Sequence, residues 1–157
     1  MAMKLLSLFA CLLLMSTVTV QAAGTPPLPK GYLNWQKSVR KVDNDKKSLF
    51  YGIHYIYADA KAMKGYRAGN KFPEGSRIVI EHFTIKDTPT GPVEGSKNMV
   101  VLMQKNARYK STGGWLYAGY TAHGKPSGLD PVKNCFECHL KDAAARDYVF
   151  SGIADFK

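Results

Sequence analysis

Runs of aromatic and β-branched residues, separated by turn-forming residues, dominate the middle of the chain. These residue types favour β-strands, and they occur in four runs, at residues 49–57, 77–85, 99–104 and 115–121. Clusters of glycine, proline and threonine that are typical of turns separate the runs, at residues 71–75, 88–92 and 112–114. The pattern predicts a mainly β domain with an antiparallel, barrel-like sheet.

Helical patterns are few and short. Residues 32–42 and 59–67 are predicted to be helices, and Asp59 stands where an N-cap side chain is expected. A helical turn is expected at residues 135–139 and another at 142–147. These helices are too short to change the mainly β assignment.

The most informative motif is Cys135-Phe136-Glu137-Cys138-His139, the C-x-x-C-H spacing of c-type haem attachment. In such a site the thiols of Cys135 and Cys138 form thioethers to the haem, and His139 is the proximal iron ligand. A zinc site would need further cysteine or histidine ligands, and a thioredoxin-like redox site would need a βαβ context. The motif therefore predicts one covalently bound haem c, attached near the C-terminus.

The first 22 residues have the pattern of a secretory signal peptide. Lys4 is their only charge, an apolar run spans residues 5–15, and cleavage is expected before Ala23. The run is too short for a membrane span, so we expect export to the periplasm and no transmembrane segment. Removal of this segment takes Cys11 with it and leaves residues 23–157 as a single haem domain.

The formal net charge is +10. In an exported haem protein this charge favours an acidic redox partner or an anionic surface over nucleic acid. Lysines that are simply solvated remain an alternative.

Several short motifs occur in a recognisable order around the haem motif, at residues 56–59, 69–76, 78–81, 113–115 and 147–150. In this order the chain resembles the cytochrome P-460 family, and within it the cytochrome c-prime-beta group. The resemblance covers most of residues 23–157. It implies a mainly antiparallel β fold, often a homodimer, with His139 on the proximal side of a five-coordinate iron.

Three positions differ from the hydroxylamine-oxidising members of that family. Ile80 stands where those enzymes carry a lysine cross-linked to the haem, His54 matches their distal arginine, and Val100 their distal glutamate. Isoleucine has no nucleophilic nitrogen, and valine cannot act as a general base. The differences favour binding of diatomic gases such as NO and CO, with NO binding or detoxification as the role, over catalysis.

The resemblance also suggests Phe83 as a cap over the iron. Arg146 lies just downstream of the haem motif and is a candidate contact to the haem propionates or the proximal face. Phe83 and Ile80 differ in strand parity, so both reach the haem only if a bulge intervenes; otherwise Phe83 is a core residue. His54 is a donor to bound ligand, a sixth iron ligand, or a structural residue.

Two other functions remain open at this point. A six-coordinate haem would make an electron-transfer cytochrome, with Met63, Met99 or Met103 as possible ligands, although no methionine follows His139. Oxidation of hydroxylamine or NO is the other alternative.

Overall fold

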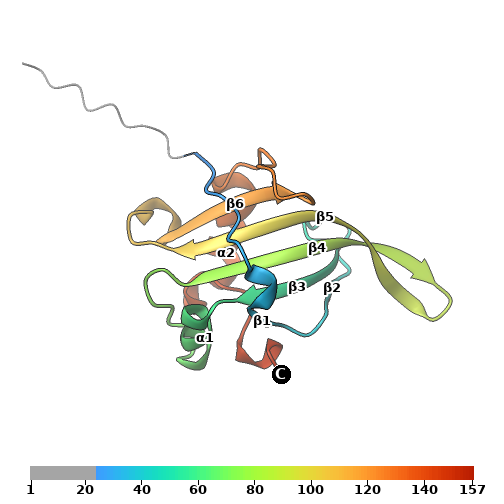
Figure 1. Ribbon diagram of the computed structural model, residues 1–157, viewed down its shortest axis with the longest axis horizontal. Helices are drawn as coiled ribbons and strands as arrows, with labels where there is room; N and C mark the ends of the chain where they lie inside the picture. Colours follow the sequence, from blue (N-terminus) through green and yellow to red (C-terminus); the bar gives the residue numbers. More distant parts are fainter. Residues whose placement is uncertain (1–23) are drawn as a thin grey trace, which may run out of the picture.

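The computed structural model describes residues 24–157, so the predicted signal peptide and Cys11 lie outside the described residues. Six strands form one sheet (Figure 1). The strands are β1 (Gln36–Lys37), β2 (Lys41–Asp43), β3 (Gly52–Ala58), β4 (Arg77–Thr88), β5 (Gly91–Lys105) and β6 (Trp115–Thr121).

The strand order is β1-β3-β4-β5-β6, with β2 also paired to β3, and every pairing is antiparallel. The predicted antiparallel β fold is confirmed. The sheet ends in β1 and β2 on one side and in β6 on the other, so it is open, and the expectation of a barrel-like closure is wrong.

The helices are short. They are α1 (Ala60–Arg67) and α2 (Glu137–Ala143), with a π-helical turn at Val132–Phe136 and 3₁₀ turns at Tyr32–Asn34, Lys110–Thr112, Ala144–Arg146 and Ile153–Asp155. The side chain of Asp59 accepts a hydrogen bond from the Ala62 amide at 2.8 Å, which confirms the predicted N-cap. No helix within residues 24–157 is long and apolar enough to cross a membrane.

The helix predicted at residues 32–42 is wrong. Only Tyr32–Asn34 is helical, and the chain then forms β1 and β2 along the edge of β3. The amide and hydroxyl of Ser38 both bond to the backbone of Ile56. The backbone polar groups of this segment find their hydrogen-bond partners on β3. The helical spacing of its apolar residues was therefore a misleading signal.

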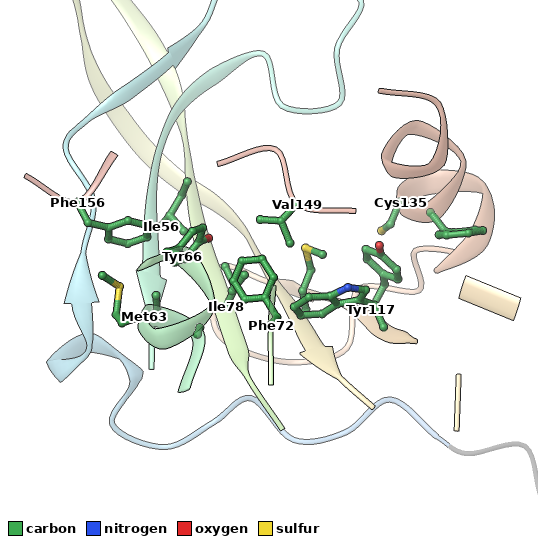
Figure 2. Close-up of a cluster of buried hydrophobic side chains, with 14 residues drawn as sticks. Ile56, Met63, Tyr66, Phe72, Ile78, Tyr117, Cys135, Val149 and Phe156 are labelled. Carbon is green, nitrogen blue, oxygen red and sulfur yellow. The ribbon is translucent and has the colours of Figure 1, made fainter. Parts of the chain in front are cut away.

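The two faces of the sheet carry separate cores. One face packs on α1, α2 and the C-terminal segment, and Figure 2 shows Met63, Tyr66 and Phe156 at one end of this core and Tyr117 and Cys135 at the other.

The opposite face is covered by the N-terminal segment, drawn in blue in Figure 1. There the Tyr32 hydroxyl donates to Glu81 at 2.8 Å, and the Tyr120 hydroxyl donates to the Pro26 carbonyl at 2.7 Å. Side-chain alternation along each strand directs successive residues to one face or the other.

Candidate functional site

A cavity of about 510 Å³ lies on the face of the sheet that packs on the helices, between the sheet, α2 and the C-terminal segment. Its lining is mostly apolar and comes from distant parts of the chain. The sheet contributes His54, Ile56, Ile78, Ile80, Val101, Met103 and Tyr117; the helical region Cys135, Cys138 and His139; the C-terminal segment Val149 and Phe150; and the loop before β3 contributes Phe50.

The C-x-x-C-H motif lies on the wall of this cavity. Cys135 lies in the π-helical turn and is buried, whereas Cys138 in α2 is exposed, and both are free thiols. Burial, followed by the nearby Cys138, raises the pKa of Cys135 to about 11. Both cysteines line the same cavity, and the thiol of Cys135 stays protonated near neutral pH.

His139 is oriented by the backbone of the C-terminal segment. Its Nδ1 lies 2.7 Å from the carbonyl oxygen of Tyr148. A carbonyl can only accept, so Nδ1 carries the proton and Nε2 keeps its lone pair. Burial lowers the pKa of His139, partly offset by this hydrogen bond, and the rings of Tyr117 and Phe150 lie 5.0 Å and 4.8 Å away. The result is a neutral, fixed imidazole with a free metal-binding nitrogen.

His54 lies on β3, directly opposite His82 of β4. Its Nδ1 is buried and has no hydrogen-bond partner within residues 24–157. Burial, and then the neighbouring His82, lower the pKa of His54 to about 4. His82 donates from Nδ1 to the Oδ1 atom of Asn98 at 2.6 Å, and Phe50 packs edge-on against both rings. His54 is therefore an uncharged polar group in an apolar wall.

With this geometry in view, the comparison with known families is decisive. The family model described as Cytochrome P460 matches residues 29–151, most of the chain. This chain belongs to the cytochrome P460 family. Family membership implies a c-type haem protein with an iron-containing cofactor. A search of curated proteins finds no match.

The structure separates the predicted distal residues of this cytochrome P460 member into two groups. Ile80 and His54 line the cavity. Val100 does not: it is buried in the core of the opposite face, and its neighbour Val101 lines the cavity instead. Because successive strand residues point to opposite faces, an alignment offset of one residue is enough to reverse the assignment.

Phe83 is also on the opposite face. It pairs with Ile53, and its ring packs on Tyr55 at 5.9 Å, away from the cavity. The β4–β5 register shifts between His82 and Phe83 and again before Ile85, and in both places the extra residue is on β5. The β4 strand itself stays in unbroken register with β3 up to Phe83, so Phe83 keeps the face opposite to that of Ile80. The role of Phe83 as a cap is therefore corrected to packing on the far face.

Arg146 is exposed and does not line the cavity. Its guanidinium donates to the carbonyl of Phe150 at 2.9 Å, so its observed contact is with the backbone of the C-terminal segment. That bond stabilises the segment beside the cavity, and Arg146 is not among the residues that line the cavity.

Sequence reasoning missed several lining residues, among them Phe50 and Tyr117. The even spacing between Phe50 and His54 could have suggested that both face the cavity. Phe50 lies before the start of β3 at Gly52, however, so strand alternation does not extend to it. Tyr117 lies opposite Met103 on β6, and its position required the register of the sheet. The hydroxyl of Tyr117 is buried with no hydrogen-bond partner in the described part of the chain.

These residues fit a haem. The cavity volume lies in the range of small-molecule and cofactor sites, about 300–1,000 Å³, and such sites are mostly apolar with a few polar groups. Two buried polar atoms in the wall, His54 Nδ1 and Tyr117 Oη, lack protein partners within residues 24–157. Within the same residues, no group of three or more histidine, cysteine and acidic side chains is placed to hold a metal ion.

Proposed function

We propose that the cavity holds one haem c, joined to Cys135 and Cys138 by thioethers and ligated by His139, and that the protein binds diatomic gases such as NO and CO at the open side of the iron. The observation that carries this proposal is the His139–Tyr148 hydrogen bond, which leaves Nε2 as the metal-binding nitrogen on the wall that also carries both thiols. Bound haem supplies an iron with a coordination position for a small ligand.

The chain's own residues define what reaches that position. Ile56, Ile80 and Val101 form an apolar wall that disfavours water and charged substrates. Ile80 offers no nitrogen for a covalent link to the haem, so we propose gas binding, including NO binding or detoxification, rather than hydroxylamine oxidation.

His54 is proposed as the hydrogen-bond donor to a ligand in the cavity. Its buried Nδ1 has no acceptor within the described residues, and an unpaired buried N–H is costly. We therefore expect the ring proton on Nε2. As a neutral group, His54 can donate to a bound ligand without placing a charge beside it.

Electron transfer by a six-coordinate haem is the second candidate, because Met103 lines the same cavity. Met103 is buried in the core with Trp115 and Tyr117, a packing role that suits methionine. His54 is a second possible sixth ligand. The Met63 side chain lies at the α1 end of the core, so we do not propose it as an iron ligand.

Export to the periplasm, a homodimeric state and an acidic redox partner are parts of the same proposal. The apolar run before Ala23 supports export, and the net charge of +10 supports an acidic partner.

Covalent attachment is tested by Cys135→Ala/Cys138→Ala. Denaturing gel electrophoresis with haem staining should show a stained band for the wild type and none for the double variant. His123→Ala, an exposed loop change, is the control that should keep the band. A stained double variant would overturn the assignment of both thioethers.

A further inference from the structure

The chain leaves the 3₁₀ turn Ala144–Arg146 through two consecutive residues with left-handed backbone. The φ angle is 51° at Asp147 and 60° at Tyr148. This conformation is uncommon outside glycine and especially so for a bulky side chain. The turn aims the Tyr148 carbonyl at Nδ1 of His139, and such backbone persists only where neighbouring contacts hold it.

Three separate segments hold Asp147 in place. Its carboxylate forms an ion pair with Lys105 at the end of β5 and accepts from the backbone amide of Phe72 at 3.3 Å. Its backbone carbonyl accepts from Nε1 of Trp115, at the start of β6, at 2.9 Å. Trp115 is fully buried, so Asp147 ties the turn to the rigid end of the sheet.

Tyr148 is held as well. Its amide donates to the Ala143 carbonyl at 2.9 Å. Its ring fills the space beside Gly113, where an added Cβ would come within 2.3 Å of the ring. Gly113 itself has a φ of +67°, so only glycine suits this position. The carbonyl of Tyr148 therefore has one direction available.

We propose that Asp147 is a positioning residue for the proximal histidine: by anchoring the left-handed turn, it holds the Tyr148 carbonyl on His139 and so sets the strength of the iron–histidine bond. The inference rests on the proposed ligation by His139. A hydrogen bond from Nδ1 fixes the ring orientation and raises the basicity of Nε2. Loss of the anchor frees the carbonyl, weakens that hydrogen bond and makes His139 a poorer donor to the iron.

The test compares Asp147→Ala with Asp147→Asn in the haem-loaded, full-length protein. Asparagine tolerates the left-handed conformation and keeps one side-chain oxygen, whereas alanine keeps neither advantage. Resonance Raman of the ferrous protein gives the iron–histidine stretching frequency, and redox titration gives the midpoint potential. We expect Asp147→Ala to lower the frequency and raise the potential, with Asp147→Asn much closer to the wild type.

Two further variants keep the test decisive. Lys105→Met keeps Asp147 but removes its ion-pair partner, together with the contacts of Lys105 to the Gly113 carbonyl and the Trp115 ring. It should shift both readouts in the same direction by less, even if Asp147→Ala does not accumulate. Tyr32→Phe removes a hydrogen bond on the opposite face and should leave both readouts unchanged.

Equal readouts for wild type, Asp147→Ala and Lys105→Met would overturn the inference while leaving His139 as the ligand. A shift of the same size in Tyr32→Phe would also overturn it, since the effect would then be one of general stability. Absence of an iron–histidine band in the wild type would overturn the proposed ligation, and this inference with it.

Discussion

Phe50 is the aromatic side chain at the distal wall of the cavity, with its ring centroid 6.2 Å from that of His54. It precedes β3 and is half-buried. A ring at this place restricts the space available to an incoming ligand. We therefore propose for Phe50 the capping role that the sequence suggested for Phe83.

Replacing Phe50 by alanine should speed association of CO and NO several-fold, because the ring no longer has to move before the ligand enters. Phe83→Ala is the matched control: it makes the same truncation on the opposite face of the sheet and should leave the rates unchanged. Stopped-flow mixing measures both. Faster association in Phe83→Ala alone would contradict the observed face assignment.

The low pKa of His54 predicts a pH dependence of stability. The folded chain binds the proton only near pH 4, whereas the unfolded chain binds it near the ordinary pKa of 6.5. Between these values the unfolded state holds more protons, so the free energy of unfolding falls as the pH falls from 6.5 toward 4. His82 and Lys41 reinforce the shift, and Asp43 and Asp155 oppose it.

His54→Gln should remove that dependence. We expect a difference of about 1–2 kcal/mol between wild type and variant over this window, after discounting for solvent at the half-buried ring. Denaturant unfolding at pH 7.5 and at pH 4.5 measures it. The same slope in both proteins would show that His54 does not titrate as the structure indicates.

At the scale of elements, strand composition was a good guide and strand length was not. The run at residues 115–121 became β6 without change, but the runs at 77–85 and 99–104 became the longer β4 and β5. Their polar extensions pair with each other in a hairpin that projects beyond the rest of the sheet (Figure 1). Such residues carry no apolar alternation, so the sequence offered no signal for them.

The helix at Asp59 was predictable because its cap is local, and its loss should be measurable. Asp59→Ala removes the bond to the Ala62 amide and the ion pair with Arg77. We expect a loss of about 1–2 kcal/mol in the free energy of unfolding. Asp59→Asn, which keeps a capping oxygen, should lose clearly less. Equal losses would mean that the ion pair, and not the cap, stabilises α1.

At the scale of the whole molecule, the sequence specified the chemistry better than the pocket. The C-x-x-C-H motif is contiguous, so Cys135, Cys138 and His139 could be named from it directly. The distal wall combines β3, β4, β5 and the loop before β3, and its membership depends on register. Val100 was assigned to the wrong face for that reason. The cap suggested for Phe83 required a bulge that β4 does not have, whereas Ile80 and His54 line the cavity.

The left-handed turn at Asp147 could not be predicted from the sequence either. Its sequence gives no glycine to mark an unusual backbone, and its anchors come from Lys105, Trp115 and Phe72. Only the folded chain brings these residues to one place.

The central claim is that the cavity holds a haem with His139 as its only protein ligand. Absorption spectra of the purified ferric and ferrous protein, recorded before and after addition of CO, test it most directly. We predict five-coordinate, high-spin spectra in both oxidation states and a ferrous form that binds CO without displacing a protein ligand. Low-spin, six-coordinate spectra with resolved α and β bands before any ligand is added would contradict it and would favour electron transfer through Met103 or His54.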